Sequence, residues 1–159
     1  LLMDRFVGEH QIPEPDPEHW QEQLRTMARN ARAMFKARRD SARLSMGRIP
    51  VGPNAMPVME RVLAVLAASG LPPRVVAYAA DLLALYVGAF AYEESVAPEG
   101  NPAEFAEYLR SLPPEEFPTI TSLGDDLTAG DADERFDFGI EVLIAGLEAL
   151  GERSRQQDG

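Results

Sequence analysis

Side chains that carry catalysis are few in this 159-residue sequence. The two histidines, His10 and His19, both lie near its start. It therefore has neither the Glu-x-x-His pairs of a di-iron bundle nor the His-x-x-x-His spacing of a helical zinc site. It has no cysteine, so thiolate catalysis, disulfides and cysteine-bound metals are excluded, and no glycine-rich phosphate loop is present. Nothing here points to an enzyme, a metal site or another cofactor.

Methionine suggests a different chemistry, the binding of an apolar molecule. Five of the six methionines fall within one stretch of the chain: Met27, Met34, Met46, Met56 and Met59. Flexible thioether side chains fill gaps in a core, but they also line adaptable pockets. Taken alone, the pattern favours the core.

Charge gives two further candidates. Asp81 interrupts the apolar window from Val75 to Tyr92. A buried carboxylate is costly unless it is paired, so we expect Asp81 to pair with a basic helix face or, as the second choice, to contact a ligand. Residues 20–48 carry eight basic and two acidic residues, and residues 93–137 carry thirteen acidic residues and two arginines, within a net charge of −11.

The basic residues between Arg25 and Arg43 recur at helical spacing. They predict a solvated helix face or, alternatively, one that contacts the acidic region 113–137 or a domain outside this chain.

Prolines divide the chain into the elements that must position these residues. Helices are predicted near 18–38, 40–46, 54–69, 74–97, 103–112 and 134–152, with a loop over 113–131. We expect residues 1–17 to be the end of a connecting helix and a proline linker, 18–152 to form one domain and 153–159 to be a disordered tail. Strand signals are almost absent, so the predicted class is all-α. The apolar window from 75 to 92 is interpreted as a buried helix, with no membrane span.

The last predicted helix has two apolar sets. Phe136, Ile140, Leu143, Leu147 and Leu150 form one seam, and Phe138, Val142, Ala145 and Ala149 form a second. Gly139 and Gly146 suggest close backbone approach. Such a wide stripe indicates packing on its own domain and on a partner. We therefore expect a homodimer through helices 74–97 and 134–152, with the first seam and Ala80, Gly88 and Ala91 at the interface.

The ordered set of helices resembles the C-terminal domain of TetR-family transcriptional repressors. Arg135 to Leu147 fits the late helix of that family, and Glu18–Gln21, Arg39–Leu44 and Ser69–Leu71 match earlier pieces. The resemblance implies a TetR-like helical domain that dimerises through a four-helix bundle. It further implies that the protein is cytoplasmic and that the domain binds a small effector. It also implies that operator DNA is bound only through a helix-turn-helix domain absent from this chain. Residues 1–7 look like the tail of a helix already under way.

The resemblance also implies an effector pocket. Matched by order, its lining residues are Met27, Ala31, Met34, Ser45, Met46, Met59, Val62, Ala77, Asp81, Ala84 and Tyr86. The tetracycline repressor has a metal-binding histidine where this chain has Ser45, and an asparagine where it has Met27. A mainly apolar effector is therefore expected, with Ser45, Asp81 and Tyr86 as polar anchors. The alternatives are a helical enzyme or lipid carrier with the same pocket, or a stand-alone interaction module.

Overall fold

The structure is a computed structural model, and it describes residues 12–37, 53–96 and 101–157. Within these ranges every regular element is a helix. The elements are α2 (Trp20–Lys36), α4 (Ala55–Ala68), α5 (Pro73–Ser95), α6 (Pro102–Ser111), α7 (Pro118–Leu123), the 3-10 helix η1 (Gly124–Leu127) and α8 (Ala132–Gln157). The all-α prediction is confirmed. The helix predicted over 40–46 lies outside the described residues.

Prolines and caps set the helix ends. Pro73 and Pro102 occupy the first turns of α5 and α6, where a missing N–H costs nothing. At α8, the Asp131 carboxylate accepts the Glu134 backbone N–H at 2.8 Å, and the Glu134 carboxylate accepts that of Asp131 at 3.1 Å. This reciprocal cap fixes where α8 begins.

Two predicted boundaries differ from the structure. The predicted loop 113–131 contains α7 and η1, because Pro118 starts a short helix. Helix α8 continues to Gln157 through the predicted tail, and Arg153 donates a hydrogen bond to the Ala149 carbonyl one turn back.

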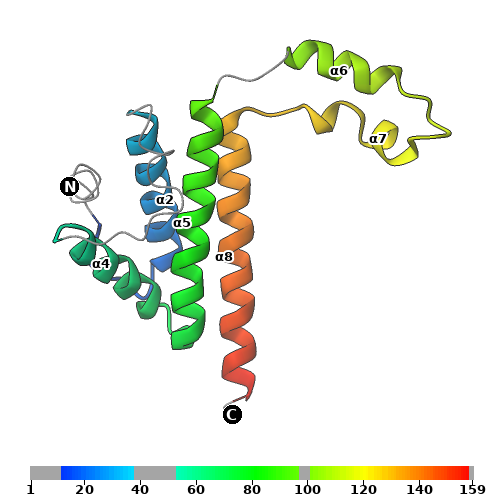
Figure 1. Cartoon of the computed structure of the whole chain (residues 1–159). Coiled ribbons are helices and arrows are strands. Elements are labelled where there is room, and N and C mark those ends of the chain that lie inside the picture. The colour runs from blue at the N-terminus through cyan, green and yellow to red at the C-terminus, as the bar shows by residue number, and fades with distance from the viewer. Residues whose placement is uncertain (1–11, 38–52, 97–100, 158–159) are drawn as a thin grey trace.

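Helices α2, α4, α5 and α8 form the body of the molecule (Figure 1). Helix α5 packs against the other three, and α8 also contacts α2. The largest fully buried side chains come from three of these helices: Leu24, Val65, Leu66, Phe136, Ile140 and Ile144. One apolar stripe of α8 thus belongs to the core of its own chain.

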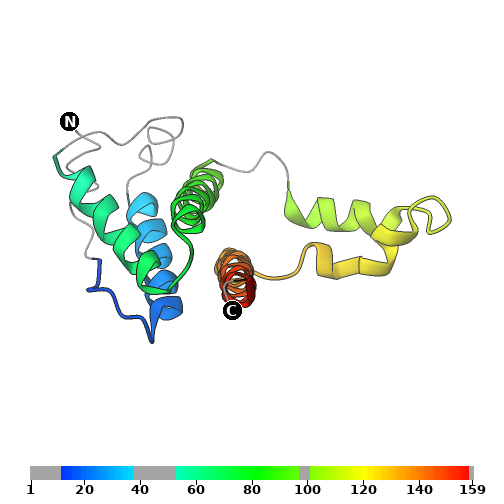
Figure 2. The same cartoon turned by 90° about the horizontal axis from the view of Figure 1, so that it is seen from below.

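Residues 101–131, here called the arm, extend from the body on the side of α8 (Figures 1 and 2). Its helices α6, α7 and η1 pack on one another, and Arg110 pairs with Asp125 at 2.9 Å across the arm. Phe105 and Tyr108 are exposed.

Helix α5 is long and apolar enough to cross a membrane by length and composition, yet only 28% of its apolar window is buried in the chain. The prediction of a buried helix holds for one side of α5 only. One face is open, with Tyr78, Leu82 and Leu85 between 49% and 62% exposed.

Candidate functional site

The basic face of α2 lies against α8 and is paired. Arg25 donates two hydrogen bonds to the Glu141 carboxylate, from Nε at 2.6 Å and from Nη2 at 2.7 Å. One turn later Arg29 contacts Asp137 with the same geometry, at 3.0 and 2.9 Å. Hydrogen bonds from these arginines lower the pKa of the Glu141 and Asp137 carboxyls. The described part of the predicted basic face is paired, although Arg29 stays 51% exposed. The predicted contact with the acidic region holds in part, since Asp137 belongs to it, and Arg43 lies outside the described residues.

Arg32 is the third member of this series and the one that is buried, with 8% of its surface exposed. Its Nε and Nη2 each donate to Glu94 at 2.7 Å, while Nη1 lies 2.9 Å from Asp133. The guanidinium lies over the rings of Phe136 and Phe90, 4.7 and 5.1 Å from their centroids. The Arg32 hydrogen bonds hold the pKa of Glu94 below its ordinary value.

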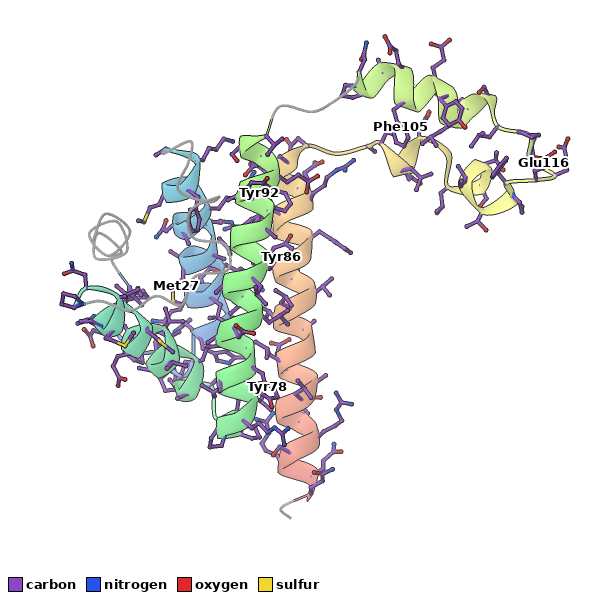
Figure 3. All side chains as sticks on the ribbon, in the orientation of Figure 1. Met27, Tyr78, Tyr86, Tyr92, Phe105 and Glu116 are labelled. Atoms are coloured by element: carbon purple, nitrogen blue, oxygen red, sulfur yellow. The ribbon has the colours of Figure 1, made fainter. Side chains whose placement is uncertain are left out.

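Tyr86 lies on the side of α5 that faces α8 (Figure 3). Its hydroxyl donates to the Phe136 carbonyl at 3.0 Å, and its ring stacks on the Phe136 ring at 5.5 Å. Burial raises the pKa of the Tyr86 hydroxyl. A Cβ at Gly139 would overlap this ring. Tyr86 is therefore part of the α5–α8 packing, and its role as a ligand anchor stays a prediction.

Asp81 is exposed, and it forms no ion pair among the described residues. The expectation of a buried, paired carboxylate is wrong, because the face of α5 that carries it is open. Ala77 and Ala84 are also exposed, and they lie four before and three after Asp81 on the same side of the helix. Of the α5 residues predicted to line the pocket, Ala77, Asp81 and Ala84 thus lie on one face of the helix, and Tyr86 lies on another.

The other predicted pocket residues lie on α2 and α4. Met27, Ala31, Met34 and Val62 are half-buried, and Met59 is 47% exposed. Met27 lies on the side of α2 toward α4 (Figure 3), and α2, α4 and α5 pack against one another. Ser45 and Met46 are outside the described residues. The structure brings three of the four predicted helices together and leaves the pocket itself a prediction.

Two shallow hollows lie elsewhere on the body. One, of ≈ 170 Å³, is at the start of α2 and is lined by residues that include Trp20, Leu71, Glu148 and Arg155. The other, of ≈ 140 Å³, runs between α5 and α8 and is lined by Ala79, Leu82, Leu83, Val142, Leu143, Gly146, Leu147 and Leu150. Neither is lined by a residue predicted for the effector pocket.

The second hollow lies within an open apolar surface that we call the α5–α8 face. Its large exposed side chains are Tyr78, Leu82, Leu85, Phe138, Val142 and Leu150, and Ala89, Ala145 and Ala149 are exposed between them. Phe138 is 71% exposed. Adjoining apolar side chains on two neighbouring helices are typical of a protein–protein contact.

The residues predicted for an interface are mostly elsewhere. Phe136, Ile140, Leu147, Gly88 and Ala91 are buried in the chain's own core, and Ala80 and Leu143 are half-buried. Among those predicted, Leu150 alone is exposed, at 39%. The second apolar set of α8, Phe138, Val142, Ala145 and Ala149, was the signal in the sequence that marks the open surface.

Residues 12–150 match the family described as "Tetracyclin repressor-like, C-terminal domain". Among curated proteins, the chain is 27% identical to the HTH-type transcriptional repressor DrrR1 of Streptomyces coeruleorubidus, over 94% of this chain and 61% of that protein. It is 28% identical to an HTH-type transcriptional regulator of Saccharopolyspora erythraea, over 94% and 64%. The chain thus spans less than two thirds of the length of these relatives.

Solved structures agree with this similarity. Apo ActR from Streptomyces coelicolor superposes with a TM-score of 0.88 and 41% identity, over 94% of this chain and 73% of that one. The same TetR family protein in complex with actinorhodin matches with a TM-score of 0.84 and 42% identity, over 93% and 72%. A third structure, of ActR in complex with (S)-DNPA, matches with a TM-score of 0.86 and 41% identity, over 93% of this chain and 72% of that one.

Proposed function

The chain belongs to the TetR family of transcriptional regulators, which are not enzymes, and we propose that it is the effector-sensing and dimerising part of such a regulator. The observation that supports a dimer is the exposed α5–α8 face. It exposes large apolar side chains on two packed helices, and a second copy related by a two-fold axis would place four helices face to face.

A second copy explains this face better than a lipid bilayer does. Only one side of α5 is apolar and open, while its other sides pack on α2, α4 and α8. A stable interface buries about 1,200–2,000 Å² in total, and two long helices from each copy supply a surface of that order. We therefore propose a homodimer located in the cytoplasm, with no membrane partner.

The effector is proposed to be a mainly apolar small molecule bound among α2, α4 and α5. The half-buried Met27, Ala31 and Met34 on α2 and Val62 on α4 support this site, as does the similarity to ActR, which has been solved with actinorhodin and with (S)-DNPA. Effector binding is proposed to release operator DNA, to which the whole protein binds through residues outside this chain.

Titration with actinorhodin as the probe tests the site. A ligand that binds only the folded state adds about 2.7 kcal/mol of stability at 100 times its Kd. Ala31→Trp, which fills the proposed site, should abolish that gain. Ala33→Trp, on the exposed side of the same helix, is the matched control and should retain it. Equal binding by both variants would place the ligand elsewhere.

A further inference from the structure

We call the last turn of α5 and the first turn of α8 the two roots of the arm, and one side chain contacts both. The chain leaves the body after α5, whose last turn carries Glu94, and it re-enters at α8, whose first turn carries Asp133. Arg32 of α2 holds Glu94 through Nε and Nη2, at 2.7 Å each, and Asp133 through Nη1 at 2.9 Å. We propose that Arg32 is the positioning residue of the arm, and that through it α2 sets the direction in which the arm points.

The environment of Arg32 suits such a role. The planar fork of arginine presents several donors in a fixed geometry, and here each of its three nitrogens faces a carboxylate oxygen. The guanidinium carbon also lies 5.1 Å from the ring centroid of Phe90 of α5 and 4.7 Å from that of Phe136 of α8. These rings are 5.2 Å apart and packed edge to face. Arg32 therefore joins three helices at the point where the arm begins and ends.

Among the described residues, the contacts of the arm are mainly internal. Its helices pack on one another, and its ion pair between Arg110 and Asp125 is internal. Both views show it extending away from the body (Figures 1 and 2). Local bonds such as the Arg135 side chain to the Ala129 carbonyl, at 3.0 Å, shape one root without reaching α2 or α5.

Two acidic residues of α8 give a matched pair for the test. Asp133 and Asp137 are one helical turn apart, and each pairs with an arginine of α2. Asp133→Ala removes one root contact of Arg32. Asp137→Ala removes a contact of Arg29 that has no link to the arm. Because the Asp133 side chain is 77% exposed, its truncation leaves the core intact.

The absence of cysteine allows spin labels to be placed cleanly at Asn30→Cys on α2 and Glu107→Cys on α6, both exposed. The labelled chain is mixed with an excess of unlabelled chain, so that an oligomer contains at most one labelled copy. A second labelled pair, Asn30→Cys with Glu152→Cys on α8, reports on the body alone.

The unmodified chain should give a single narrow distance distribution between α2 and α6. Asp133→Ala, and Arg32→Met where it folds, should broaden and shift that distribution while the α2–α8 distance stays unchanged. Asp137→Ala should leave both distances unchanged. A residue that only stabilises the fold would lower the unfolding temperature of the variant without changing the arm distance. An unchanged arm distance in folded Asp133→Ala would overturn the proposal, as would equal broadening by Asp137→Ala.

Discussion

At Gly139 the backbone of α8 lies so close to Tyr86 that no side chain fits between them. The glycine lets the Tyr86 ring reach Phe136 and lets its hydroxyl donate to the Phe136 carbonyl. A glycine inside a helix costs about 1 kcal/mol relative to alanine. Here the close contact between α5 and α8 offsets that cost.

Gly139→Ala should therefore destabilise the fold, although alanine is the better helix former. Overpacking of this kind costs about 1–3 kcal/mol, and urea unfolding measures it. Gly146→Ala is the matched control on the same helix, because a Cβ there has no neighbour within 4 Å, and it should gain up to about 1 kcal/mol. Since Gly146 lies in the hollow of the α5–α8 face, both variants are compared in a monomeric background. A fully stable Gly139→Ala would contradict the structure.

Single residues were the part of the site least predictable from sequence. The prediction of close backbone approach is confirmed at Gly139, which meets Tyr86 of its own chain, but not at Gly146, where a Cβ would meet nothing within 4 Å. Asp81 was expected to be buried because its neighbours are apolar. It is exposed because apolar side chains also cover the open face of α5. The sequence shows that a helix face is apolar, but it does not show whether the chain's own core or another surface covers that face.

At the scale of elements, α2 and α8 are joined by a series of charge pairs. Arg25, Arg29 and Arg32 meet Glu141, Asp137 and Asp133 in antiparallel order. Exposed pairs of this kind contribute about 0.2–1 kcal/mol each, whereas Glu94 bonds to a buried arginine. The energetic weight of the series therefore lies at Arg32 and Glu94.

This difference predicts how stability depends on pH. The pKa of Glu94 is lowered in the folded chain by the Arg32 hydrogen bonds. The bond to Arg32 therefore stabilises the fold fully above the unfolded pKa of about 4.5. That stabilisation is lost as the pH falls from there through the lower, folded pKa.

Glu94→Gln should lower the unfolding free energy at pH 7 by about 1.5–3 kcal/mol and flatten its decline below pH of about 4.5. Urea titrations at several pH values measure both effects. Glu107→Gln, exposed on the arm, should change neither. A Glu94→Gln chain with the same acid dependence as the unmodified chain would assign that dependence to other carboxyls.

The helices themselves were largely predictable, because prolines and apolar periodicity mark them directly. The periodicity of α8 showed two apolar sets but could not say which one faces inward. The structure places Phe136 and Ile140 inside and Phe138 and Val142 outside. Helical spacing is the same for both sets, so only packing against α2 and α5 distinguishes them.

At the scale of the whole molecule, the inward and outward sets of α8 should respond differently to charge. Val142→Glu places a carboxylate on the exposed α5–α8 face, where Val142 is 53% exposed. This variant should remain folded but become monomeric. Leu147→Glu places the same group at a position that is 7% exposed, and an unpaired buried charge should unfold the chain. Sedimentation and circular dichroism separate the two outcomes. A dimeric Val142→Glu would show that this face is not the interface.

The charge pairs of α2 also bear on DNA binding. Non-specific binding to duplex DNA depends on free basic groups that neutralise phosphates. Arg25, Arg29 and Arg32 already contact carboxylates of their own chain, and the net charge is −11. The arginines of α2 are therefore occupied by internal partners and offer little to a phosphate backbone.

We accordingly predict that this chain alone does not bind duplex DNA at physiological salt, with any Kd weaker than about 10⁻⁴ M. On the proposed function, a full-length protein that joins a helix-turn-helix domain to this chain should bind its promoter region tightly, with an affinity that falls as salt rises. Fluorescence anisotropy on the same duplex measures both proteins. Arg29→Glu in the full-length protein is the control, and should leave the affinity unchanged because Arg29 is engaged with Asp137. Sequence-specific binding by the chain alone would mean that the body itself reads DNA, against its assignment as a sensing and dimerising domain.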